Sequence, residues 1–151
     1  MSNLDIAFKI DSKGFYDIDL TDNGDLLSTQ GLDTAILMSI FCEKRANEDE
    51  IPRPEYRRGD WSNELNEISD YEVGSKLWLL DQARTSQSSL DDAIEYIREG
   101  LQWLIDDGYI LDVDITGELT TRQATFTITL TKLNNTTETK VFEYFKNTRY
   151  I

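Results

Sequence analysis

Residues 124–131 have the sequence Ala-Thr-Phe-Thr-Ile-Thr-Leu-Thr, in which an apolar residue alternates with threonine throughout. Successive side chains of a β-strand point to opposite faces of the sheet, so this pattern predicts a strand with one apolar and one polar face. Strands of this kind form antiparallel sheets that are covered on one side only. The sequence therefore predicts a one-sided sheet with another element packed on its apolar face.

Two flanking segments complete the expected sheet. Residues 111–115 alternate apolar side chains with Asp112 and Asp114, and residues 141–145 provide a further apolar strand. Asn134-Asn135 fits the turn between the last two strands because asparagine tolerates a positive φ. We expect an antiparallel three-stranded meander.

The segment 89–107 is predicted to be the helix that covers this sheet. Ser89 followed by Asp92 resembles a capping box, and Gly108 is placed to end the helix. Gly100 inside it costs about 1 kcal/mol relative to alanine, and we interpret it as a site of close packing. The apolar side chains recur at helical spacing and form one stripe: Leu90, Ile94, Ile97, Leu101 and Leu104.

The N-terminal half combines short strands with shorter helices. Alternation predicts strands at 6–10 and 16–20 and the start of another at Leu26-Leu27, and a helix is expected from about 32 to 46, with Lys44-Arg45 in its last turn. Two prolines make 47–60 a loop, and 74–83 is expected to be a short helix. The predicted fold class is α+β. We expect residues 1–151 to form a single domain with N-terminal short strands, central helices and a C-terminal meander packed on a long helix.

Composition restricts the possible partners. The chain has 151 residues, of which 39% are apolar, and a net charge of −14. Such a chain can bury roughly 70% of its unfolded surface in a core. An acidic surface repels nucleic acid and anionic lipid and favours basic protein partners. A single cysteine, Cys42, allows no intrachain disulfide and fits a reducing cytoplasm, and neither a signal peptide nor a membrane segment is evident.

Catalytic chemistry is sparsely represented. The chain contains no histidine, which removes the commonest general base and the commonest zinc ligand. Residues 19–24 partly match a calcium loop, but Gln30 stands where the bidentate carboxylate belongs, so a hairpin turn is favoured. Acidic clusters alone do not identify a glycosidase pair. We expect no catalytic residue, no cofactor and no metal.

An arginine-rich segment, residues 53–61, stands out in this acidic chain. Arginine and tryptophan are enriched in interface hot spots, and arginine pairs well with carboxylates. Internal pairing with the chain's own acidic residues is the alternative. Trp78 and Trp103 are expected in the core. The candidate partner-interface residues are Arg53, Arg57, Arg58, Gly59 and Trp61.

Taken in order, these motifs resemble the Mu-like phage GP46 family of tail baseplate proteins. The resemblance covers nearly the whole chain. Family members often have a second aromatic residue after the Arg-Arg-Gly turn, where this chain has Asp60 before Trp61. The motifs that carry the resemblance are Gly24-Asp25-Leu26, Gly31-Leu32-Asp33-Thr34-Ala35, Arg57-Arg58-Gly59, Gly74 to Trp78, Leu101 to Leu104 and Asp107-Gly108.

The resemblance implies a structural, non-enzymatic baseplate wedge protein of a contractile tail, similar to the proteins that initiate the tail sheath. Such proteins form sixfold rings, bind the other wedge proteins and connect to the tail sheath protein by strand addition. The implied location is the virion, in the tail baseplate. Two alternatives remain: a carboxylate-dependent, lysozyme-like peptidoglycan hydrolase of the tail, and a cytoplasmic acidic adaptor unrelated to phage.

Overall fold

The computed structural model describes residues 4–10, 12, 15–30, 32–51, 57–59 and 72–146. The chain divides into two compact units, Met1–Met38 and Ser39–Ile151, and the boundary falls within helix α1 (Asp33–Phe41). Each unit mixes strands with helical residues, which confirms the α+β class.

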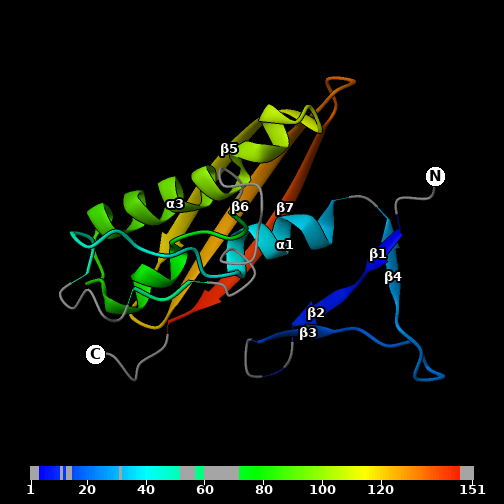
Figure 1. Ribbon diagram of the computed structural model, residues 1–151, viewed down its shortest axis with the longest axis horizontal. Coiled ribbons are helices and arrows are strands. Elements are labelled where there is room, and N and C mark those ends of the chain that lie inside the picture. Colours follow the sequence, from blue (N-terminus) through cyan, green and yellow to red (C-terminus); the bar gives the residue numbers. More distant parts are fainter. Residues whose placement is uncertain are drawn as a thin grey trace. The chain divides into compact units, whose positions relative to one another are not determined.

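The larger unit contains the predicted meander. Strands β5 (Ile110–Leu119), β6 (Gln123–Lys132) and β7 (Thr137–Phe145) form an antiparallel sheet in the order β5-β6-β7 (Figure 1). All three are longer than the alternating segments that predicted them. Asn135 has a φ of 64° in the turn between β6 and β7, as expected for an asparagine turn.

Helix α3 (Gln87–Asp106) lies along one face of this sheet, nearest to β5 (Figure 1). The predicted stripe is confirmed, except that Ala93 is buried and Ile94 only half-buried. The predicted cap was wrong by one turn. Ser86, not Ser89, is the N-cap, because its hydroxyl accepts a hydrogen bond from the Ser89 amide at 3.1 Å. Gly108, with a φ of 78°, ends the helix as predicted.

The core lies between α3 and the apolar face of the sheet. Alternate residues of β6 point toward the helix, and Phe126, Ile128 and Leu130 are each no more than 2% exposed. Ile97 and Leu101 on α3 have no exposed surface. This is the one-sided packing that the alternation of residues 124–131 requires.

Helix α1 ends at Phe41, so the helix expected to reach residue 46 was predicted too long. After Phe41 the backbone bonds other segments: the Ser75 amide donates to the Cys42 carbonyl at 3.0 Å, and the Lys44 amide donates to the Ser75 carbonyl at 3.0 Å. Gly74 permits this approach. Its φ is 105°, and a Cβ there would lie 2.3 Å from the Cys42 carbonyl oxygen. These tertiary hydrogen bonds replace the last helical turn.

The predicted short helix at 74–83 is a 3₁₀ helix, η2 (Leu77–Gln82). Its side chains explain its place in the fold, because Leu77, Trp78 and Leu80 are at most 3% exposed. The core position predicted for Trp78 is confirmed. Trp103 is only half-buried, and its indole N–H donates to the Ser39 hydroxyl at 2.8 Å.

The smaller unit is built from two short antiparallel ladders. β1 (Leu4–Ile6) pairs with β4 (Ser28–Gln30), and β2 (Phe8–Ile10) pairs with β3 (Tyr16–Ile18). The strand expected at Leu26-Leu27 begins two residues later.

A tight turn joins Leu20 to Leu26, which form an isolated antiparallel bridge. The Thr21 amide donates to the Asp25 carbonyl at 2.8 Å, and Gly24 has a φ of 85°. The hairpin interpretation of residues 19–24 is therefore confirmed. Within the described ranges, no group of three or more acidic or cysteine side chains is arranged to hold a metal ion.

Gly100 lies at a close contact between α3 and the segments around Ser39 and Ser75. A Cβ on Gly100 would lie 2.7 Å from the Ser39 carbonyl oxygen and 3.0 Å from the Ser75 Cβ. Backbone atoms cannot withdraw as a flexible side chain can. The predicted role of Gly100 in close packing is confirmed.

We expect Gly100→Ala to lower the free energy of unfolding by about 1–3 kcal/mol, because overpacking outweighs the gain in helix propensity of about 1 kcal/mol. Chemical denaturation of the purified protein measures this change in the free energy of unfolding. Ser88→Ala, at an exposed position of the same helix, is the control and should change stability little. A Gly100→Ala variant more stable than the wild type would contradict the packing role.

Candidate functional site

The structure describes three of the five candidate interface residues. Arg57, Arg58 and Gly59 are placed, whereas Arg53 and Trp61 lie outside the described residues. The three placed residues lie against the segment that follows α1. A Cβ built on Gly59 would be 3.2 Å from the Cβ of Arg45.

Arg57 is held by the chain's own backbone. The Ala46 amide donates to the Arg57 carbonyl at 3.0 Å, and Arg57 Nε donates to the Ala46 carbonyl at 2.6 Å. One guanidinium nitrogen also lies 3.6 Å from the carboxylate of Glu48, which is largely exposed. A solvent-exposed pair of this kind contributes little. The reciprocal bonds to Ala46 are the contacts that fix Arg57.

Arg58 occupies a more enclosed position. Its Nη1 donates to Glu43 Oε1 at 2.8 Å and lies 3.9 Å from Asp81 Oδ2. The guanidinium is also 4.9 Å from the ring centroid of Trp78, within range of a cation–π interaction. Arg58 has a φ of 53°, a left-handed conformation that a non-glycine residue rarely adopts. The contacts to Glu43, Asp81 and Trp78 hold it there.

The buried carboxylate of Asp81 connects this segment to the sheet. Asp81 is only 3% exposed and accepts a hydrogen bond from the Tyr144 hydroxyl at 2.8 Å. The ring of Phe41 stacks on Tyr144 with centroids 6.3 Å apart. Burial, and then the neighbouring Asp81 carboxylate, raise the pKa of Tyr144 far above its ordinary value. We call Glu43, Arg58, Trp78, Asp81 and Tyr144 the Arg58 network.

Internal pairing, the alternative to a partner interface, is thus what the structure describes for Arg57 and Arg58. Sequence reasoning missed Asp81 and Tyr144. Asp81 follows four apolar residues, Leu77 to Leu80, in a segment that was expected to be helical. A charged residue directly after an apolar run was the available signal. Nothing in the sequence pairs Asp81 with Tyr144, which lies 63 positions away.

The carboxyls with shifted pKa values do not resemble a general acid. Burial alone would raise the pKa of Glu50, but hydrogen bonds from the Asn47 amide and the Lys76 ammonium outweigh burial, and the pKa is lowered. Hydrogen bonds from Lys140 and Lys132 lower the pKa of Glu138. A glycosidase acid needs a raised pKa, so both shifts run in the wrong direction.

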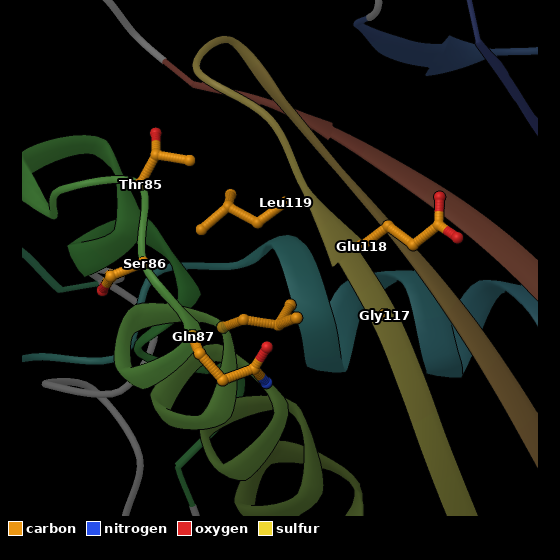
Figure 2. A pocket seen from close by; sticks show the side chains of 7 residues that line it. Thr85, Ser86, Gln87, Gly117, Glu118 and Leu119 are labelled. Atoms are coloured by element: carbon orange, nitrogen blue, oxygen red, sulfur yellow. The ribbon is translucent and has the colours of Figure 1, made fainter.

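A hollow of about 430 Å³ opens between the start of α3 and the end of β5 (Figure 2). Ser86, which lies at its rim, already caps α3. The carboxylate of Glu118 points away from the hollow (Figure 2). The side chains that remain there offer no pair of groups for acid–base chemistry. The hollow is lined by Thr85, Ser86, Gln87, Leu90, Gly117, Glu118 and Leu119.

Comparison with known proteins identifies the family. The sequence model of the family described as "Phage protein GP46" matches residues 32–137, from the start of α1 to the start of β7. This protein belongs to the GP46 family. The matched region of this GP46 protein contains four of the five residues of the Arg58 network, and Tyr144 lies beyond it.

Two curated relatives support the assignment. The Mu-like prophage FluMu protein gp46 of Haemophilus influenzae is 37% identical over 90 residues, which are 60% of this chain and 59% of the relative. The baseplate protein gp46 of Escherichia phage Mu is 31% identical over 103 residues, which are 66% of this chain and 69% of the relative. The match to the Haemophilus relative therefore covers less than two thirds of that protein. In the described part of this GP46 protein, no helix has the length and apolarity needed to cross a membrane.

We expect Arg58→Ala to lower the free energy of unfolding by about 2 kcal/mol, because it leaves the buried Asp81 carboxylate without its cation and removes the contact with Trp78. Denaturation by urea measures the loss. Arg84→Ala removes the same charge at an exposed position and should change stability by less than about 0.5 kcal/mol. Equal effects of the two substitutions would show that the network does not stabilise the fold.

The raised pKa of Tyr144 predicts a pH dependence. The folded state holds the phenol proton more tightly than the unfolded state, so its contribution is complete below about pH 10 and is lost as the pH rises further. Tyr144→Phe should therefore destabilise the protein at pH 7, and the difference from wild type should shrink above pH 10. Melting temperatures from pH 7 to 11 test this, with Tyr109→Phe, at a half-exposed position, as the control.

Proposed function

We propose that this protein is a structural component of a contractile phage tail baseplate, where it binds other wedge proteins and helps to initiate the tail sheath. The observation that carries the proposal is membership of the GP46 family together with the similarity to the baseplate protein gp46 of phage Mu. The proposed location is the virion tail, after synthesis in the host cytoplasm.

The side-chain chemistry of the described residues supports a scaffold rather than a catalyst. Arg57 and Arg58 contact the chain's own carbonyls, carboxylates and an aromatic ring. Among the described carboxyls, Glu50 is held in the charged form by the Asn47 amide and by Lys76, and Glu138 by Lys140 and Lys132, so the pKa of each is lowered. Groups held in this way increase rigidity, which an assembly protein needs. The peptidoglycan-hydrolase alternative has no comparable support from these contacts.

The Arg53–Trp61 segment is proposed as the contact with a neighbouring wedge protein. Within it, Arg57, Arg58 and Gly59 are fixed against Ala46, Glu43 and Arg45. Preorganised segments bind with a smaller loss of conformational entropy. In this proposal the internal contacts of Arg57 and Arg58 anchor the segment, while Arg53 and Trp61 on either side provide partner contacts.

The three-stranded sheet supports the proposed connection to the sheath. In the described residues, β5 and β7 each pair with β6 alone, so the sheet has two edge strands. An edge strand can accept an additional strand from another chain through backbone hydrogen bonds. We propose that sheath subunits attach in this way, with the protein repeated in a sixfold ring.

Tail particles purified from phage that encode this protein provide the test. The wild-type protein should be found in the baseplate by mass spectrometry, and Arg53→Ala combined with Trp61→Ala should reduce its incorporation at least tenfold without changing its melting temperature. Arg84→Ala is the matched surface control.

The outcomes separate two claims. Absence of the wild-type protein from purified tails would refute the baseplate function itself. Normal incorporation of the Arg53→Ala/Trp61→Ala variant would leave the baseplate function in place and exclude the segment as an anchor.

A further inference from the structure

In the described part of the larger unit, no helix or strand covers the face of the β5-β6-β7 sheet that points away from α3. It carries residues 112–118 of β5 at even positions, and residues 123–131 of β6 and 137–145 of β7 at odd positions. We call it the outer face. The outer-face residues of β5 and β7 are exposed. The even-numbered residues 124–130 of β6, which point toward α3, are buried. Among the described residues, the outer face is therefore exposed along β5 and β7 and half-buried along β6.

The charge of this outer face has one sign. Asp112, Asp114 and Glu118 lie along β5, Glu143 lies on β7, and the three strands place no lysine or arginine there. Figure 2 shows the Glu118 carboxylate on the side of β5 away from α3, whereas Leu119 points toward the helix. Some acidic side chains elsewhere in this unit pair with lysine or arginine, as Glu43, Glu50 and Glu138 do.

Stability of the sheet does not explain this arrangement. Alternate residues of one strand are about 7 Å apart, so Asp112 and Asp114 repel each other on the same face. Like charges on one sheet face destabilise it. Aspartate is also a poor strand former. The aspartates on β5 thus reduce the stability of the strand that contacts α3.

The remaining outer-face residues suit a protein surface as partner. The centre of the face is a row of threonines, two of which, Thr129 and Thr139, have hydroxyl oxygens 3.4 Å apart across the strands. Along β7, Val141 is 61% exposed and Phe145 is 41% exposed. Strands of 9 or 10 residues give a face roughly 30 Å long. That length suits one side of a small protein interface.

Charge decides which partner fits. A second copy placed face to face would bring two sets of carboxylates together, and nucleic acid would meet them with phosphates, so both arrangements are repulsive. A protein surface that presents lysine or arginine would pair with the β5 carboxylates and cover Val141 and Phe145 with apolar atoms. Complementary charge of this kind sets specificity and association rate.

We infer that the outer face is a docking surface for a basic protein surface, in which lysine or arginine side chains meet Asp112, Asp114 and Glu118 while apolar side chains cover Val141 and Phe145. This inference rests on the proposed function, because it takes the partner to be another baseplate protein. It assigns a surface on the sheet face, distinct from both the Arg53–Trp61 segment and the strand edges.

The first experiment uses a heptapeptide of alternating lysine and threonine as the probe, titrated into the full-length protein and followed by amide chemical shifts. The shifts should concentrate on β5, β6 and β7. Asp112→Asn combined with Asp114→Asn and Glu118→Gln should weaken binding about tenfold. The control triple, which we call the α3 triple, combines Glu99→Gln and Asp106→Asn on α3 with Asp107→Asn at its C-cap. It changes the net charge equally at exposed positions and should weaken binding less than twofold.

Folding of the variants is checked by thermal melts, in which the β5 triple should be at least as stable as wild type because the mutual repulsion is removed. Thr139→Lys, which keeps every carboxylate and adds a cation to the face, is a second variant and should also weaken binding. Equal weakening by the β5 and α3 triples, or shifts spread over α3, would overturn the inference. The inference would also be overturned if the wild-type protein formed a dimer and the Thr139→Lys substitution dissociated that dimer.

The second experiment separates this inference from the proposed function. In purified tails the β5 triple should be depleted at least tenfold relative to the α3 triple. If both triples are incorporated like wild type, the docking surface is refuted while the baseplate function stands. If the wild-type protein is absent from tails, the baseplate function fails, and the choice of a baseplate protein as partner fails with it.

Discussion

The buried carboxylate of Asp81 is the constraint on which the arrangement of the larger unit depends. A charge removed from water must be neutralised and hydrogen-bonded, or it costs several kcal/mol. Arg58 supplies the positive charge from one segment, and Tyr144 supplies the hydrogen bond from the last strand. Three parts of the chain that are distant in sequence are therefore held in one geometry. The left-handed backbone at Arg58 is maintained for the same reason.

A second constraint is that the described elements cover the sheet on one side only. Helix α3 and the ring of Phe41 pack against apolar side chains on one face, and Gly100 lets the segments around Ser39 and Ser75 approach α3 closely. The opposite face carries mainly threonines and carboxylates, together with Val141 and Phe145 on β7. The face therefore combines a regular strand surface with negative charge. The same alternation that builds the core thus produces the surface that we assign to a basic partner.

Much of the larger unit could be predicted because its signals are local. The alternation in 124–131 and the stripe on α3 each follow from a periodicity of two or 3.6 residues. The errors occurred where tertiary contacts competed with local preference. Helix α1 stops at Phe41 because the Cys42 carbonyl and the Lys44 amide bond the backbone of Ser75. The N-cap moved from Ser89 to Ser86 because several serines and acidic residues compete for one helix start, and only the geometry selects among them.

The sequence by itself determined the α+β class, the meander and the helix that covers it. It also determined the acidic character and the resemblance to the GP46 family. These follow from periodicity, turn residues, ordered motifs and net charge, which require no knowledge of distant contacts. Only the tertiary structure decided what Arg57 and Arg58 do. From the sequence they could have met a partner or the chain's own acids, and the fold brings Ala46, Glu43 and Asp81 to them. Ion pairing depends on distance in space, and residues such as Asp81 and Tyr144, 63 positions apart, are adjacent only once the chain has folded.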